Sequence, residues 1–252
     1  MITQKNYHSE TTRMSKSGLW KIYNGTPADY HHHYLSGEPK SVPSTPFRVG
    51  TALDVAVLTP ENYIEDIQVV DRISKNLDWT LGKNYIRFEE NEMVQKMKAS
   101  IFNHYAARSI LEDNVCFMQD IREFTEPETG INGKIAVDCA IPEKKWLVDL
   151  KSSDDASPKG FYWNAIKYGY DMQGAWYKDG YEAATGNEIT SFIFIVVEKT
   201  APYKVACYFM TPEMLQNGRQ KYLQACKIYA ECMVSGEWYG YSDSVMPLDK
   251  PY

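Results

Sequence analysis

The sequence predicts an α/β fold, with a mixed central β-sheet flanked by helices, on three observations. Two alternating runs, Lys134–Ile141 and Lys145–Ser152, surround the turn Pro142–Lys144 and predict a β-hairpin. The run Ser191–Glu198 is rich in β-branched residues and predicts a further strand. Segments with helical spacing of apolar residues precede, separate and follow these strands. This order is that of a sheet with helices on both faces.

The first half of the chain is predicted to be mostly helical. Thr26 followed by Pro27 is typical of a helix N-terminus, and this short helix should run to about Tyr34. The other elements expected here are a proline-rich loop, a helix, a short strand, an irregular segment and a long helix: Gly37–Pro46, Phe47–Leu58, Ile67–Val70, residues 71–90 and Glu92–Leu111.

The second half carries the predicted sheet. In the first hairpin strand, strict alternation places Ile135, Val137 and Cys139 on one side. In the second hairpin strand, alternation places Asp149 and Lys151 on the side opposite Val148. The remaining expected elements are two strands and three helices: Val115–Met118, Tyr203–Phe209, Gly160–Lys167, Tyr170–Thr185 and residues 211–234.

Composition limits the classes of protein that this chain can represent. The chain has 252 residues and no linker, so we expect a single domain over 1–252, with a mostly helical elaboration over 1–112 and the core over 113–241. Its net charge of −6 argues against a tail-driven nucleic-acid binder but allows a local basic groove. Five cysteines without a C-x-x-C pair indicate a reducing cytoplasm and no zinc ribbon. No apolar stretch is long enough to span a membrane.

The hairpin carries the most informative polar residues. Period two places Asp149 and Lys151 on one face of a strand, and the turn can bring Asp138 beside them. Two close carboxylates repel each other unless a cation lies between them, and Mg²⁺ prefers such oxygen ligands. A nearby lysine can orient or deprotonate a water molecule, so the pattern indicates metal-assisted phosphodiester hydrolysis. A solvated strand face with an ordinary ion pair is the alternative interpretation.

The helix that follows carries Gln173 and Tyr177 one turn apart, on the same face. An amide and a phenol so placed can line a site beside the acids, and ordinary packing is the alternative. Around this helix start, Lys159 and Lys167 are candidates for phosphate contact, and Tyr162 and Trp163 are candidates for stacking on DNA bases.

Together these residues resemble the PD-(D/E)XK nuclease core with its Q-x-x-x-Y helix. More narrowly, the chain resembles RecE-type exonucleases (exodeoxyribonuclease VIII) of phage and prophage recombination modules. The stretches that carry this resemblance follow the family's order along the chain: Arg48–Leu53 with G-T-A-L, Asp138, Asp149–Ser153 with Asp155–Ser157, Tyr168–Tyr177, and Trp238–Tyr241.

The resemblance implies Mg²⁺-dependent 5′→3′ degradation of one strand of linear double-stranded DNA, with Mn²⁺ as a possible substitute metal. It implies metal binding by Asp138, Asp149 and the Leu150 carbonyl, with Lys151 positioning the attacking water. Gln173 and Tyr177 would support the site. The family usually has His where this chain has Asp54, an oxygen ligand that can still bind Mg²⁺. An upstream acid is also expected, and Glu123 is our candidate.

The resemblance further implies a bacterial or phage-encoded cytoplasmic protein that acts on DNA ends, forms a ring of identical subunits and works with a single-strand annealing protein. Two alternatives remain open. One is another PD-(D/E)XK activity, an endonuclease or an end-trimming enzyme. The other is a catalytically weakened protein that binds DNA ends during recombination, for which Asp54 is the only support.

Overall fold

The computed structural model describes the whole chain except residues 1, 4–6, 8, 38–41, 80–82 and 248–252. Its centre is a five-stranded sheet in the order β3-β4-β5-β6-β7, in which only β5 and β6 run parallel. The parallel pair is joined by a helical crossover, as such a pair requires. The strands are β3 Phe117–Thr125, β4 Asn132–Ile141, β5 Trp146–Ser153, β6 Ser191–Glu198 and β7 Val205–Phe209. A parallel pair outside this sheet joins β1 Ile67–Val70 and β2 Asn84–Arg87.

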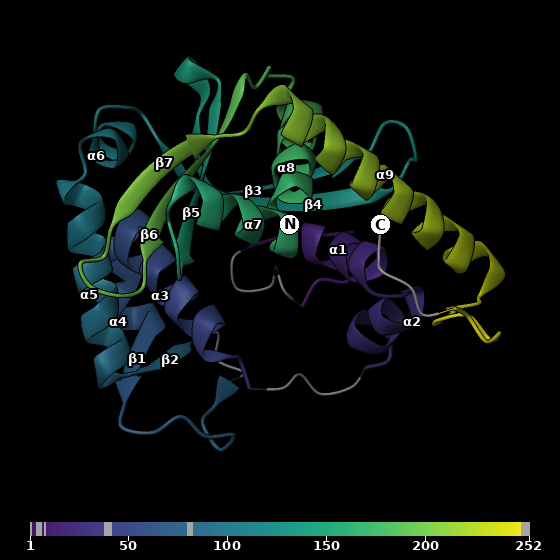
Figure 1. Cartoon of the computed structure of the whole chain (residues 1–252), viewed down its shortest axis with the longest axis horizontal. Coiled ribbons are helices and arrows are strands. Elements are labelled where there is room, and N and C mark those ends of the chain that lie inside the picture. Colours follow the sequence, from purple (N-terminus) through teal and green to yellow (C-terminus); the bar gives the residue numbers. More distant parts are fainter. Residues whose placement is uncertain (1, 4–6, 8, 38–41, 80–82, 248–252) are drawn as a thin grey trace.

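Helices cover both faces of the sheet (Figure 1). The α-helices are α1 Lys16–Asn24, α2 Pro27–Tyr30, α3 Thr45–Leu58, α4 Tyr63–Asp66, α5 Phe88–Asn103, α6 Tyr105–Glu112, α7 Pro158–Tyr168, α8 Tyr170–Thr185 and α9 Pro212–Ser235. Shorter helical turns span His31–Leu35, Pro60–Asn62 and Pro142–Lys144. The predicted fold class, a mixed sheet flanked by helices, is confirmed.

Two buried clusters hold the layers together, one on each face of the sheet. Leu147 and Phe192 pack with Trp176 on the α8 and α9 side. Val148 packs with Leu53 on the α3 and α5 side. Burial on both faces explains the near-continuous apolar sequence of β6. The predicted alternation of the second hairpin strand is therefore confirmed.

The first hairpin strand departs from strict alternation. Ile135 and Val137 share one side, as predicted, and that side faces α8. Cys139 packs on the opposite, α3 side, so its predicted placement with them is wrong. The change from one face of the sheet to the other occurs at Asp138. Opposite Asp138, Gln119 of β3 has a left-handed φ of 52° and interrupts the β3–β4 ladder. At this irregular point of the backbone, Asp138 lies between two apolar neighbours that pack on opposite faces of the sheet.

Other differences from the predicted elements have local causes. The predicted helix Glu92–Leu111 is two helices, because His104 adopts an extended backbone and its ring caps α6 by accepting from Ala107 N–H. Residues 71–90 are not wholly irregular, because they include β2, which pairs with β1. The strand expected over Val115–Met118 instead spans Phe117–Thr125, since pairing with β4 satisfies a polar segment that lacks an apolar pattern. Helix α1 was not predicted. The expected loop Gly37–Pro46 includes residues 38–41, outside those described.

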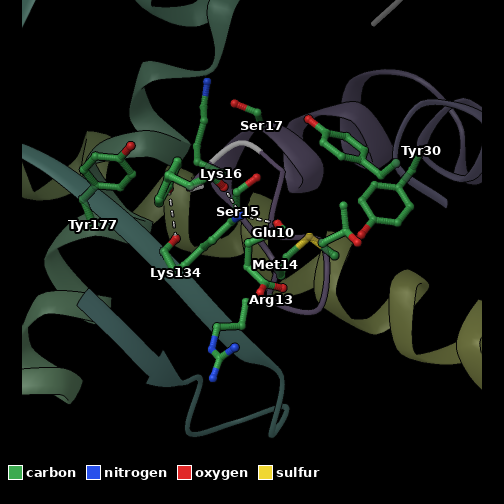
Figure 2. A pocket seen from close by; sticks show the side chains of 12 residues that line it. Glu10, Arg13, Met14, Ser15, Lys16, Ser17, Tyr30, Lys134 and Tyr177 are labelled. Atoms are coloured by element: carbon green, nitrogen blue, oxygen red, sulfur yellow. Dashed lines mark hydrogen bonds between the residues drawn. The ribbon is translucent and has the colours of Figure 1, made fainter. Parts of the chain in front are cut away.

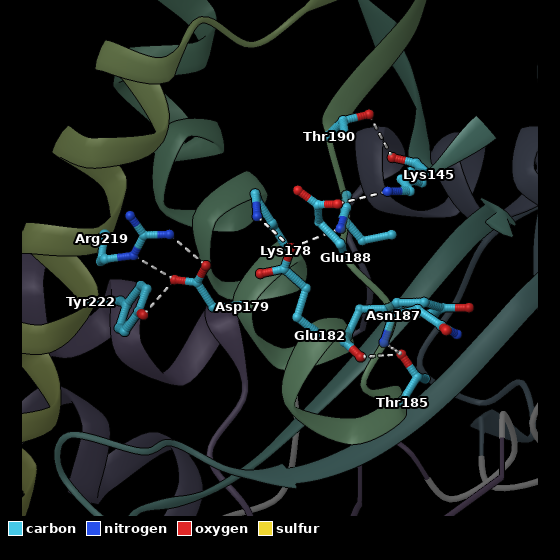
Figure 3. Close-up of polar contacts among 12 residues, drawn as sticks. Lys145, Lys178, Asp179, Glu182, Thr185, Asn187, Glu188, Thr190, Arg219 and Tyr222 are labelled. Atoms are coloured by element: carbon cyan, nitrogen blue, oxygen red, sulfur yellow. Dashed lines mark hydrogen bonds and ion pairs between the residues drawn. The ribbon is translucent and has the colours of Figure 1, made fainter. Parts of the chain in front are cut away.

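Helix α8 is held in place by side chains of α9 (Figure 3). Asp179 accepts from Arg219 Nε at 2.7 Å and from Tyr222 Oη at 2.6 Å. At the end of α8, Glu182 pairs with Lys178 and accepts from Ile189 N–H, which fixes the entry into β6. These charge-assisted contacts orient the helix that carries Gln173.

No helix in the described part of the chain combines the length and apolarity that crossing a membrane requires.

Candidate active site

The β4–β5 hairpin opens at its acidic residues. Backbone pairing covers Ile141 with Trp146, Ala140 with Leu147, and Cys139 with Val148, and then stops. The next pair in this register would be Asp138 opposite Asp149. Instead, the Asp138 carboxylate accepts from Leu150 N–H at 2.8 Å, so a side chain replaces the missing ladder contact.

Asp149 is the most enclosed of the candidate residues, with 2 % of its surface exposed. Its Oδ1 accepts a short hydrogen bond from the Gln173 amide of α8. Its Oδ2 forms a close ion pair with the Lys151 ammonium. Period two along β5 thus brings Asp149 and Lys151 together, as expected. Gln173 reaches Asp149 from α8.

Asp54 brings a third carboxylate to the same place from α3. Burial and the negative charges of Asp138 and Asp149 raise the pKa of Asp54 well above its ordinary value. Burial and Asp149 likewise raise the pKa of Asp138 to about 7. The raised pKa values of Asp54 and Asp138 mark a site that favours an added positive charge.

Lys151 remains an ammonium in this surrounding. Burial alone would lower its pKa, but Asp149 and Asp138 overcome that effect and raise it above the ordinary value. The ammonium also lies 5.1 Å from the centre of the Tyr170 ring. A lysine so held can donate hydrogen bonds and stabilise negative charge, and it is a poor base.

A second lysine approaches from α1 and was missed from the sequence. Burial and the nearby charge of Lys151 lower the pKa of Lys16 to about 7. Lys16 Nζ donates to the Tyr168 carbonyl at 2.6 Å and lies 5.8 Å from the Tyr170 ring centre. No local pattern signals this contact, because Lys16 is more than 130 residues from Asp149.

Tyr177 lies one turn beyond Gln173, where its hydroxyl is hydrogen-bonded to Tyr7. Burial and Tyr7 raise the Tyr177 pKa well above its ordinary value, so this phenol stays protonated. Tyr7 and Tyr177 line a pocket of about 110 Å³ beside the site. Figure 2 shows this pocket with Tyr177 on one side and Tyr30 on the other. Tyr7 was also missed from the sequence.

The structure does not bring Glu123 to this cluster. Glu123 lies opposite Lys134, four residues along β4 from Asp138, which is about 13 Å along a strand. Its carboxylate pairs with Arg13 at 2.8 Å and accepts from Ile2 N–H. Glu123 therefore fastens the N-terminal segment to β3, which is a sufficient structural role for it.

The four candidate DNA contacts lie on α7, outside the acidic cluster. Lys159, Tyr162, Trp163 and Lys167 are all exposed. The helix that carries them follows β5 after a short turn, so they are near the site without belonging to it.

The donor set at the hairpin opening fits a hard divalent cation. Among the described residues, no three histidine, cysteine or acidic side chains are already arranged to enclose a metal ion. Instead, Lys151 and the Leu150 N–H occupy oxygens of Asp149 and Asp138. The carboxylates of Asp54, Asp138 and Asp149 nevertheless gather the hard oxygen donors that such cations prefer, and the raised pKa values of Asp54 and Asp138 show that their negative charges are not fully compensated.

Comparison with known proteins tests the family and the fold. Among curated proteins, none matches the chain. A protein from Eubacterium rectale, named a putative exonuclease, is similar in structure over 100% of this chain and 96% of its own, with 20% identity and a TM-score of 0.71. A phage-related exonuclease from Haemophilus somnus covers 93% of this chain and all of its own, with 16% identity and a TM-score of 0.39.

Residues 15–249 match the family model described as a PDDEXK-like domain of unknown function, DUF3799. The match spans nearly the whole chain, and the neighbour from Eubacterium rectale shares its fold. The predicted resemblance to PD-(D/E)XK nucleases is therefore confirmed at the level of family and fold. The chain therefore belongs to DUF3799, a family of PDDEXK-like domains.

Proposed function

We propose that this protein is a divalent-cation-dependent exonuclease that hydrolyses phosphodiester bonds of linear double-stranded DNA. The observation that carries the proposal is the convergence of Asp138, Asp149, Lys151 and Gln173 where the β4–β5 ladder stops. Carboxylates, a charged lysine and an orienting amide at one buried opening are suited to phosphoryl chemistry.

Asp138 and Asp149 would hold Mg²⁺, or Mn²⁺ in its place, with the carbonyl of Leu150, the residue after Asp149, as a further ligand and Asp54 adjacent. When bound, such an ion supplies Lewis acidity at the phosphodiester. Gln173 fixes the orientation of Asp149 through Oδ1, and Oδ2 contacts the Lys151 ammonium. A bound cation would therefore have to displace Lys151 from this oxygen or share the oxygen with it.

Lys151 is the group that acts on the reacting atoms. Its raised pKa keeps the ammonium charged, so it orients the attacking water and stabilises negative charge on the phosphate rather than removing a proton. The face of the Tyr170 ring supports the ammonium from one side. Tyr177 stays protonated and can donate to a phosphate oxygen.

The finer assignments rest on the resemblance to RecE-type exonucleases. We propose 5′→3′ digestion, a role in phage-type homologous recombination, a ring of identical subunits and a single-strand annealing protein as the partner. A cytoplasmic location in a bacterium follows from the same assignment.

The test uses linear duplex DNA labelled at either the 5′ or the 3′ end, with closed circular DNA as control. With Mg²⁺, early release of the 5′ label as mononucleotide from linear DNA, and intact circles, are expected. The Lys151→Ala variant should leave both linear substrates intact.

Each other outcome selects a different function. Cutting of closed circles indicates an endonuclease. Binding of DNA ends without cleavage in Mg²⁺ or Mn²⁺ indicates a recombination scaffold, in which the third carboxylate, Asp54, has changed the metal site. Full activity of Lys151→Ala would overturn the proposed site.

A further inference from the structure

Helix α7 presents an exposed row of lysines and aromatic rings that the hydrolytic site does not use. Lys159, Trp163 and Lys167 are spaced by four residues and therefore share one ridge of the helix. Trp163 is 60% exposed and Tyr162 is 47% exposed. The surface, which we call the α7 stripe, consists of Lys159, Tyr162, Trp163, Lys167 and Tyr168.

The α7 stripe rests on a firmly held helix. Ser157 caps its N-terminus, and on the opposite face Phe161 is stacked on Tyr208 at 5.5 Å between ring centres. Asn164 donates to Ser153 Oγ at the end of β5. Exposed aromatic rings on a rigid support lose little conformational entropy when a ligand covers them.

Aromatic rings continue from the stripe to the hydrolytic site. Tyr168 lies 5.9 Å from Tyr170, ring centre to ring centre. Lys151 in turn lies over the Tyr170 ring. The Tyr168 carbonyl also accepts from Lys16, which ties the end of α7 to α1. A chain of contacts therefore links the α7 stripe to Lys151.

The charge of the stripe suits a polyanion. Helix α7 contains two lysines and no acidic residue, in a chain whose net charge is −6. The two acids just before it are engaged, because Asp154 pairs with Lys199 and Asp155 accepts from Ser157 N–H. Phosphates provide the complementary charge.

We propose that the α7 stripe binds single-stranded DNA, with unpaired bases stacked on Trp163 and Tyr162 and phosphates at Lys159 and Lys167. Exposed ring faces favour this occupant over a duplex, whose bases are already stacked on one another. The inference rests on the proposed function, since an exonuclease on duplex DNA generates an unpaired strand at its site.

The experiment measures binding of a fluorescent oligo(dT) 20-mer and of a 20-base-pair blunt duplex by anisotropy, in EDTA, with the full chain. Trp163→Ala should weaken oligo(dT) binding about tenfold, and Trp163→Phe should restore most of it. Lys159→Ala with Lys167→Ala should reduce the salt slope of log K by about 1.4. Tyr105→Ala, which removes a ring that is 79% exposed on α6, is the matched control and should bind as wild type does.

Two results would overturn the inference: oligo(dT) affinity within twofold of wild type in Trp163→Ala, or an equal loss of duplex affinity in that variant. Failure of wild type to bind oligo(dT) overturns it as well. The proposed function fails separately, if wild type digests no linear duplex in Mg²⁺ or Mn²⁺. Binding in EDTA is independent of cleavage, so the two failures are distinguishable.

Discussion

The two halves of the β4–β5 hairpin are built from the same two strands but differ in role: one half is paired and apolar, and the other is open and acidic. Near the turn, Ala140 and Cys139 pair with Leu147 and Val148, and all four are buried and apolar. Beyond Val148 the backbone pairing ends, and Asp138 and Asp149 stand where the next pair would be. The paired half supplies stability, whereas the open half gives up ladder hydrogen bonds and gathers charge. A hairpin can thus hold an acidic opening because its other half is well packed.

The largest difference should be seen in catalysis when a lysine is removed from each half. Lys151→Met in the open half should lower Mg²⁺-dependent nuclease activity by about 10³-fold or more, since a charged donor at the reacting phosphate is lost. Initial rates on linear duplex DNA provide the measurement.

The matched control is Lys145→Met at the turn, where a half-exposed lysine pairs with Glu188. This variant should keep activity within about twofold, because exposed ion pairs contribute little. A loss of less than tenfold in Lys151→Met would remove Lys151 from the reaction.

The free energy of unfolding should depend more on the paired half than on the open half. Leu147→Ala in the paired half removes a fully buried side chain and should lower the free energy of unfolding by about 2–5 kcal/mol. Asp149→Asn should change it by less than about 1.5 kcal/mol, because relief of repulsion offsets the lost ion pair with Lys151. Urea denaturation of the metal-free proteins tests both. Equal losses would show that the open half is structural.

Cation binding should depend on the open half alone. Mg²⁺ at about 100 times its dissociation constant should stabilise wild type by about 2.7 kcal/mol, seen as a rise in Tm. Leu147→Ala should show the same rise from a lower starting Tm. Asp138→Asn combined with Asp149→Asn should show none. A Tm rise that survives in this double variant would place the cation elsewhere.

The smallest effect concerns pH. The folded-state pKa of Asp138 is about 7, above its value in an unfolded chain. A carboxyl shifted in this direction stabilises the fold below about pH 4, and this contribution is lost as pH rises through 7. The Tm of metal-free wild type should therefore fall by a few degrees over that range, and by less in Asp138→Asn. Parallel pH profiles of the two proteins would contradict the shift.

Local patterns in the sequence were sufficient for the hairpin and for part of the site. Period two along a strand places Asp149 and Lys151 on one face, and a four-residue helical step places Gln173 beside Tyr177. Such spacings depend only on backbone geometry, so they survive in any fold that keeps the strand and the helix. The family's fold follows from the same motifs, and the family match confirms it.

Only the tertiary structure decided which distant residues join the site. Lys16 reaches Tyr168 from α1, while Glu123 is directed to Arg13 instead. Asp54 was expected at the metal site from the family resemblance alone, and the packing of α3 is what brings it near the acids. The backbone irregularity at Asp138 likewise depends on Gln119 of the neighbouring strand. The physical reason is the same in each case. These contacts form between elements that are far apart in sequence and meet only when the chain folds, so no local periodicity predicts them.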